Sequence, residues 1–116
     1  QGVSSAASDV YKRQMTYSKE YIEENVNCTT FDDWLTTNKD LNIGFIKIDV
    51  QGFEKEVLEG MKKFLQDCHD VYIYLEWDES LTNSNGNFLT DLETILTNNN
   101  FELSESLEND KLFYKK

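Results

Sequence analysis

The sequence predicts one α/β domain in which a mostly parallel sheet carries flanking helices. Short β-branched and aromatic runs alternate along the chain with amphipathic helical runs, a pattern typical of β–α–β units with right-handed crossovers. The chain has 116 residues, of which 39% are hydrophobic, so it holds one modest core and no more than one domain.

The strongest strand signal is Ile43–Val50, where β-branched and aromatic residues precede Gly52. Its largely apolar character on both faces predicts a strand in the middle of a covered sheet. The run Phe53–Leu65 has apolar residues at helical spacing and predicts one helix, with Gly60 inside it.

Further elements follow in alternation. Val71–Trp77 predicts a second strand that ends near Glu76. A loop at Ser84–Gly86 then leads to an amphipathic helix over Phe88–Leu96. The last two short runs predict a terminal hairpin or edge pair, Phe101–Leu103 with Leu112–Tyr114.

The region before the first strong strand is more polar. Thr29 or Thr30 can cap a helix that starts at Thr30, and Asp32 and Asp33 fall in its first turn, where the helix dipole favours acids. Glu20–Cys28 predicts a short strand that ends near Cys28.

Residues 1–14 differ in character from the rest of the chain. The string SSAASDVYKRQ resembles translated sequencing-adapter sequence, and it lacks the apolar centre of a signal peptide. We therefore expect residues 1–14 to be a non-native, disordered leader and residues 15–116 to be the domain, whose true N-terminus lies further upstream.

The charge of the chain restricts its partners. The formal net charge is −11, and the single arginine, Arg13, lies in the expected leader. Such a chain repels phosphate backbones and anionic lipid, so nucleic acid and membrane partners are not expected. Cys28 and Cys68 lie forty positions apart, and with His69 as the one histidine they form no zinc pattern. Two reduced thiols without an export signal predict a cytoplasmic protein.

The residues that suggest chemistry lie between Lys47 and Gly60. Asp49 stands at the exit of the predicted strand, Gly52 permits a sharp turn, and Glu54 opens the next helix. Because Lys47 lies two residues before Asp49, both share one strand face. We predict Asp49, Glu54 and Lys47 as catalytic residues; structural roles for Glu54 as a helix-start acid and for Lys47 as an ion-pair partner remain open.

Ligands of such sheets bind beyond the carboxyl ends of the strands. Three more polar residues are expected on that rim and are predicted to bind substrate: Gln51, Glu76 and Asp78.

In combination, the segments TFDDWL, IGFIKIDVQGFEKEVLEGM and VYIYLEWDE resemble the C-terminal half of the FkbM family of methyltransferases. The resemblance covers about Thr30 to Glu76 and continues more weakly to the end. Gln51 stands where the family often has Glu, and Phe31 where it often has Leu. The matching positions are Thr30, Asp32, Asp33, Lys47, Asp49, Gly52, Glu54, Leu58, Gly60 and Glu76.

The resemblance implies a class I, Rossmann-like methyltransferase fold, S-adenosylmethionine as donor, and a hydroxyl of a small molecule or glycan as acceptor. Cofactor binding in such folds needs a glycine-rich loop after the first strand, and no G-x-G occurs in this sequence. We therefore expect the chain to be the C-terminal half of the enzyme, inactive without its N-terminal half, with its cofactor-binding residues unknown.

Other classes stay open at this point. A non-catalytic acidic α/β interaction module would need no cofactor. A phosphoacceptor receiver domain would place its acidic pair about forty residues before the strand-end aspartate, whereas Asp32 and Asp33 precede Asp49 by 17 and 16 positions. A Mg²⁺ or Ca²⁺ site would draw on oxygen ligands, here Asp49, Glu54, Glu76 and Asp78, although solvated rim carboxylates favour the expectation of no metal.

Overall fold

The computed structural model describes residues 22–80 and 87–116. The predicted leader at residues 1–14 and the predicted loop Ser84–Gly86 lie outside the described residues. In chain order the elements are α2 (Phe31–Thr36), β1 (Phe45–Ile48), α3 (Glu54–Glu59), α4 (Lys62–Asp67), β2 (Val71–Glu76), α5 (Phe88–Asn98), β3 (Glu102–Ser106) and β4 (Asp110–Lys115).

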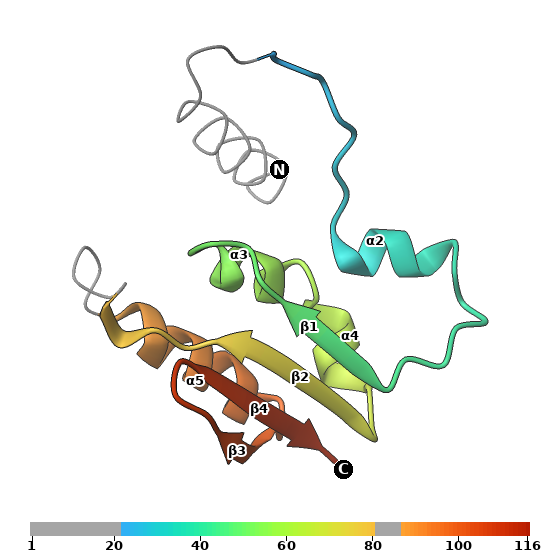
Figure 1. Ribbon diagram of the computed structural model, residues 1–116. Helices are drawn as coiled ribbons and strands as arrows, with labels where there is room; N and C mark the ends of the chain where they lie inside the picture. The colour runs from blue at the N-terminus through green and yellow to red at the C-terminus, as the bar shows by residue number, and fades with distance from the viewer. Residues whose placement is uncertain (1–21, 81–86) are drawn as a thin grey trace.

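The strands form one mixed sheet with the order β1-β2-β4-β3 (Figure 1). β1 and β2 are parallel, whereas β4 is antiparallel to both β2 and β3. The prediction of a mostly parallel sheet is therefore wrong, because β4 returns through a tight turn and enters between β2 and β3. The predicted terminal hairpin is confirmed, since Leu107 donates its N–H to the Asp110 carbonyl at 2.9 Å across that turn.

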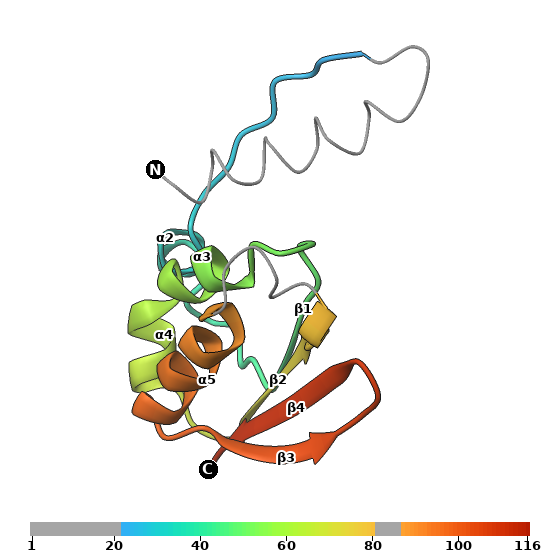
Figure 2. The ribbon, with the colours of Figure 1, turned by 90° about the vertical axis from the view of Figure 1, so that its left-hand side faces the viewer.

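The helices all cover the same face of the sheet (Figure 2). Inward-facing side chains of β2, among them Ile73 and Leu75, are fully buried in the same core as Leu58 of α3 and Leu92 of α5. On the other face, Phe45 of β1 keeps 58% of its surface exposed. The prediction that β1 is covered on both faces is thus wrong for the described residues, in which it is an edge strand.

The single helix predicted over Phe53–Leu65 is two helices, α3 and α4. The break falls at Gly60 and Met61, where the low helix propensity of Gly60 combines with hydrogen bonds from α2. The Gly60 carbonyl accepts the Asp32 N–H at 3.0 Å. The Asp32 carboxylate accepts the N–H groups of Lys63 at 2.8 Å and Phe64 at 3.0 Å, which gives α4 a cap from a distant part of the chain.

The helix predicted at Thr30 is confirmed as α2. The Thr30 hydroxyl accepts the Asp33 N–H at 3.1 Å and so caps the helix. The strand predicted over Glu20–Cys28 is not formed within residues 22–28. These residues have no regular secondary structure, and apolar side chains among them, such as Val26, are exposed. Among the described residues, none of the helices is long and apolar enough to cross a bilayer.

Candidate functional site

The turn from β1 into α3 has a strained, left-handed backbone. Gln51 has φ of +54° and Gly52 has φ of +98°. The second value lies in a region that side chains disfavour, so glycine is the residue that fits there. This turn directs the chain from the strand exit at Asp49 back towards the helical layer.

Glu54 holds this turn from inside the protein. Its carboxylate accepts the N–H of Val50 at 3.1 Å, and both of its oxygens accept the N–H of Gly52, at 3.2 and 3.3 Å. Only 1% of the residue is exposed. Burial raises the pKa of the Glu54 carboxyl, although the backbone donors at Val50 and Gly52 oppose that shift. Glu54 therefore acts on the backbone of the turn, and its predicted catalytic role stays a prediction.

Asp49 and Glu76 lie side by side at the carboxyl ends of the parallel strands. The register that pairs Ile48 with Leu75 brings them to the same edge. A depression of about 240 Å³ opens there, lined by Lys47, Ile48, Asp49, Gln51, Tyr74, Glu76, Asn109 and Asp110. The exposed Asp49 accepts a hydrogen bond from Gln51 Nε2 at 3.1 Å. Four predicted site residues, Lys47, Asp49, Gln51 and Glu76, are thus brought together; we call this depression the rim cavity.

The rim cavity is strongly acidic. Burial raises the pKa of the Glu76 carboxyl, and the charges of Asp49, Glu54, Asp78 and Asp110 raise it further. A carboxyl whose pKa is raised is better matched to proton transfer near neutral pH than an ordinary one.

Lys47 lies in the rim cavity as predicted, whereas Asp78 lies outside it. Among the described residues Lys47 forms no ion pair with Asp49, although both line the rim cavity. Asp78 lines a neighbouring depression with Ser80, whose N–H and hydroxyl it accepts at 2.9 and 2.6 Å. These two hydrogen bonds lower the pKa of Asp78.

Sequence reasoning missed three polar residues of the rim cavity, Tyr74, Asn109 and Asp110, and the apolar Ile48. Asp110 opens β4 and pairs in register with Glu76, and its carboxylate accepts the Tyr74 hydroxyl at 2.5 Å. The turn-like string Glu108-Asn109-Asp110 is visible in the sequence. The sequence does not show, however, that β4 returns antiparallel to β2 and so brings this turn to the rim cavity.

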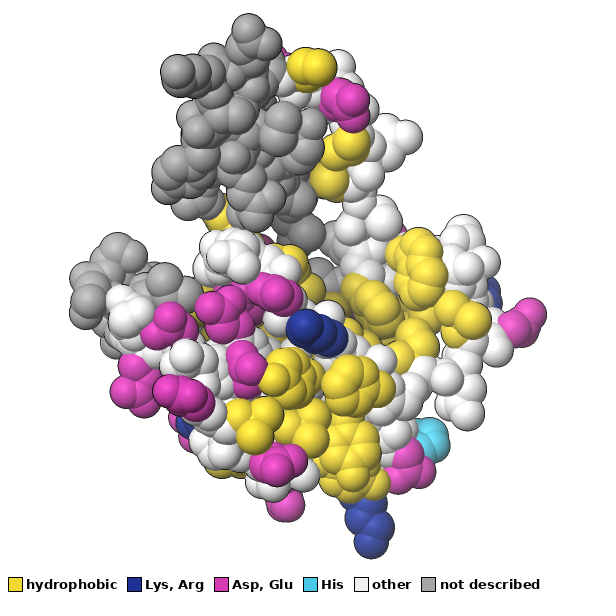
Figure 3. All heavy atoms as spheres, in the orientation of Figure 1, with side chains coloured by type: hydrophobic (Ala, Val, Ile, Leu, Met, Phe, Trp, Pro, Cys, Tyr) yellow, Lys and Arg dark blue, Asp and Glu magenta, His cyan; other side chains and the backbone are white. Residues whose placement is uncertain are grey.

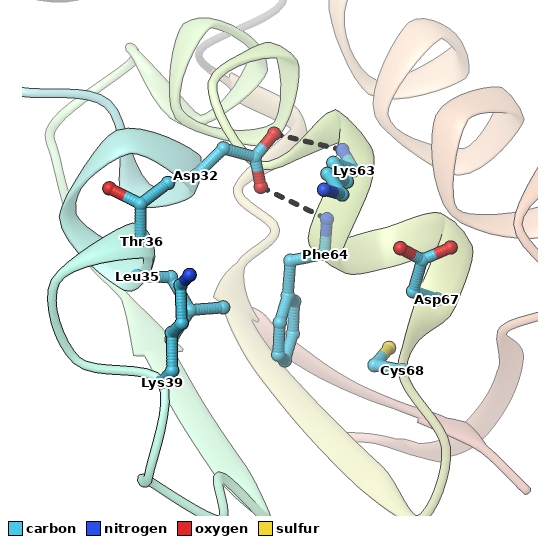
Figure 4. A pocket seen from close by; sticks show the side chains of 8 residues that line it. All are labelled: Asp32, Leu35, Thr36, Lys39, Lys63, Phe64, Asp67 and Cys68. Carbon is cyan, nitrogen blue, oxygen red and sulfur yellow. Dashed lines mark hydrogen bonds between the residues drawn. The ribbon is translucent and has the colours of Figure 1, made fainter.

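A larger depression of about 390 Å³ lies between α2 and α4 (Figure 4). Its lining is mainly apolar, with Leu35, Phe64 and the stems of Lys39 and Lys63, and the Asp32 cap closes one side. It contains none of the predicted site residues. The smaller rim cavity is the candidate site because it gathers the groups that can take part in acid–base chemistry.

The described residues do not gather a metal site. No group of three or more His, Cys, Asp or Glu side chains among them is placed to hold an ion. Cys28 and Cys68 are free thiols.

The sequence family follows from a comparison with known proteins. The family model of the methyltransferase FkbM domain matches residues 2–103. The chain therefore belongs to the FkbM methyltransferase family, and its domain is a methyltransferase domain. No curated protein and no solved structure matches the chain.

Proposed function

We propose that this chain is the acceptor-side half of an S-adenosylmethionine-dependent methyltransferase that methylates a hydroxyl of a small molecule or glycan. One observation carries the proposal: the parallel pair β1 and β2 delivers Asp49 and Glu76 into one cavity at the carboxyl ends of the strands. Ligands of parallel sheets bind at that edge, and the family supplies the reaction class.

In this proposal the carboxylates act on the acceptor. Asp49, held by Gln51, accepts the hydrogen bond of the acceptor hydroxyl and takes its proton as the hydroxyl oxygen gains the methyl group. Glu76, beside Asp49 at the same edge of the sheet, accepts a hydrogen bond from a neighbouring hydroxyl of the acceptor. The many hydroxyls of a small polar molecule or sugar also suit the polar lining of the cavity.

The described residues do not fit the methyl donor itself. A nucleoside cradle requires glycines that let the backbone approach the ligand closely. Gly44 and Gly52 are the glycines with open space where a side chain would stand, and they lie at opposite ends of β1 rather than in one loop. The residues that hold the donor are therefore expected in the N-terminal half of the domain, and we assign no step to the donor here.

Calorimetric titration tests the division into halves. Residues 1–116 titrated with S-adenosylmethionine are expected to give no measurable heat of binding at micromolar donor. Micromolar affinity would show that this chain carries a donor site and would overturn the division.

A substitution tests the role of Asp49. In a protein that joins this chain to a donor-binding half, Asp49→Asn is expected to lower kcat by about 10²–10⁴, the usual contribution of acid–base groups. Asp40→Asn, in an exposed loop, serves as the control. Unchanged turnover in the Asp49→Asn protein would remove Asp49 from the mechanism.

A further inference from the structure

The depression of about 390 Å³ between α2 and α4, drawn in Figure 4, is separate from the rim cavity and shares none of its lining residues. We call it the interhelix cavity. Two of its lining residues, Lys39 and Cys68, lie on the segments that lead into the amino ends of β1 and β2. The rim cavity opens at the carboxyl ends of the same strands. A ligand in the interhelix cavity therefore binds away from the residues proposed for methyl transfer.

The floor of the interhelix cavity is apolar. Leu35 of α2 and Phe64 of α4 line it. The Phe64 ring is held from behind by Phe31, with ring centroids 5.0 Å apart in an edge-on arrangement, and both rings pack against the core. A volume of about 390 Å³ lies at the lower end of the range for small-molecule sites, roughly 300–1,000 Å³. The floor therefore suits the apolar body of a small ligand.

Two lysines flank this floor. Figure 4 shows Lys39 on the side of α2 and Lys63 on α4. Within the described part of the chain neither lysine forms an ion pair, whereas Lys55 pairs with Asp91 at 3.1 Å. Long lysine side chains place their stems along apolar surface and keep their ammonium groups at its edge. The two ammonium groups are thus available to an anionic group at the mouth of the cavity.

Two carboxylates also line the interhelix cavity, and they differ in what they contact. The oxygens of Asp32 accept the backbone N–H groups of Lys63 at 2.8 Å and Phe64 at 3.0 Å, so this carboxylate already has its partners. Asp67 lies on the far side of Phe64 from Lys39 (Figure 4). The free acidic charge therefore lies at one end of the cavity, away from Lys39.

The rest of the surface is unfavourable to anions. The chain carries a formal net charge of −11, and Figure 3 shows acidic side chains spread over one face with few basic ones among them. Such a charge distribution repels small anions. An apolar anion is therefore expected to bind where unpaired lysines adjoin an apolar hollow, and the interhelix cavity meets both conditions.

We propose that the interhelix cavity binds a small monocarboxylate with an apolar body, of the size of a medium-chain fatty acid. The body lies against Leu35 and Phe64, and the carboxylate accepts hydrogen bonds from the ammonium groups of Lys39 and Lys63. A dicarboxylate fits less well, because its second charge would approach Asp67. This inference does not depend on the proposed methyl transfer.

Three probes of equal chain length test the proposal on residues 1–116: octanoate, octanol and octylammonium. Amide chemical shifts follow the binding and locate it. Octanoate is expected to bind with a Kd on the order of 0.1–1 mM, as the usual ligand efficiency gives for about ten non-hydrogen atoms. Its shifts should lie in α2 and α4. Octanol should bind about fivefold more weakly, and octylammonium about tenfold more weakly.

Alkylation of the two cysteines provides a second measurement. Cys68 lines the interhelix cavity, whereas Cys28 precedes α2 and does not line it, and both are free, half-buried thiols. At about four times its Kd, octanoate should slow the reaction of Cys68 with iodoacetamide about fivefold, because about one fifth of the protein is then free of ligand. The rate at Cys28 should not change.

Matched variants test the contact with the carboxylate. Lys39→Met and Lys63→Met keep the apolar stems and should each weaken octanoate binding about twofold to fivefold, the range of exposed ion pairs, without changing octanol binding. Lys62→Met is the control, because Lys62 is exposed and lines a different depression. Asp67→Asn should have the opposite effect and strengthen octanoate binding about twofold. Circular dichroism verifies that each variant is folded.

Four results would overturn the proposal. Octylammonium that binds as tightly as octanoate would show that the lysines do not select the ligand, and octanol that binds as tightly would show an unselective apolar hollow. Octanoate shifts confined to the strands, or equal protection of Cys28 and Cys68, would place the ligand elsewhere. The three probes are compared on the parent chain, so this comparison decides the question even where a variant does not fold.

Discussion

The carboxylate of Glu54 receives the backbone N–H of Gly52 with both of its oxygens, at 3.2 and 3.3 Å. The same carboxylate accepts the N–H of Val50. A buried acid thus satisfies the donors of a left-handed turn between Asp49 and the helix that follows. Because Gln51, which lies within this turn, donates to Asp49, the position of the exposed carboxylate depends on the buried one.

The first prediction concerns this turn. Glu54→Gln places an amide NH₂ in a buried pocket that offers donors, so one of its hydrogens is left without an acceptor. We expect the free energy of unfolding to fall by about 1–3 kcal/mol, as measured by urea denaturation. The Gly52 amide resonance should shift at the same time. Glu59→Gln, at an exposed position of the same helix, should change neither; equal loss in both variants would contradict the role of Glu54.

The second prediction concerns Glu76 and pH. The folded protein raises the pKa of Glu76 above its ordinary value of 4.5, so the folded state binds this proton more tightly than the unfolded chain does. The contribution of Glu76 to stability is therefore full below pH 4.5 and is lost as the pH rises through the raised pKa.

Glu76→Gln removes this loss of stability at higher pH, because glutamine does not ionise. We expect the variant to be more stable than the parent at pH 7 by about 0.5 kcal/mol, a size common for relief of like-charge contacts, and the difference should vanish below pH 4.5. Thermal unfolding across this pH range provides the measurement, with the exposed Glu93→Gln as control. A parent that is more stable than Glu76→Gln at pH 7 would show that Glu76 has a favourable partner in the fold.

The third prediction concerns the cap between α2 and α4, drawn in Figure 4. Asp32→Ala removes the acceptor for the N–H groups of Lys63 and Phe64. We expect a loss of about 1–2 kcal/mol, which lowers Tm by about 4–8 °C per kcal/mol in a domain of this size. The neighbouring Asp33→Ala is the natural comparison, because that exposed side chain makes no cap and should cost about 0.5 kcal/mol through the helix dipole alone. If the two variants have the same Tm, the cap does not stabilise the fold.

Local signals explain which parts of the site the sequence predicts. Asp49 and Gly52 follow from a strand–glycine–helix pattern within one short segment, and Glu76 follows from the end of the next strand. Tyr74 and Asp110 meet only because β4 turns back between β2 and β3, and no short-range pattern encodes that order. The sequence does not predict the burial of Glu54 either, because a glutamate in a first helical turn normally faces solvent.

The face of the sheet that points away from the helices illustrates a signal that was present in the sequence. In Val71–Glu76 the apolar residues Val71, Ile73 and Leu75 alternate with Tyr72 and Tyr74, and the first set is buried while the second is partly exposed. Tyrosine satisfies both a core pattern and a surface pattern, so alternation alone did not distinguish a covered strand from a half-covered one. In the fold, the partial exposure of Tyr72 and Tyr74 shows that β2 is covered on one face only.

The last prediction concerns Lys115, which is 8% exposed near the end of the chain. Its ammonium donates to the carbonyls of Leu65 at 2.8 Å and Gln66 at 3.0 Å, which belong to the last turn of α4. Lys115→Met keeps the apolar stem but leaves both carbonyls without this donor, so we expect a loss of about 1–3 kcal/mol in urea denaturation. Lys116→Met removes an equal charge from an exposed position and should have little effect. Since Lys115 connects β4 to the helical layer, its loss should also speed hydrogen exchange in β3 and β4 before it does so in β1; uniform acceleration would show that the hairpin does not depend on this contact.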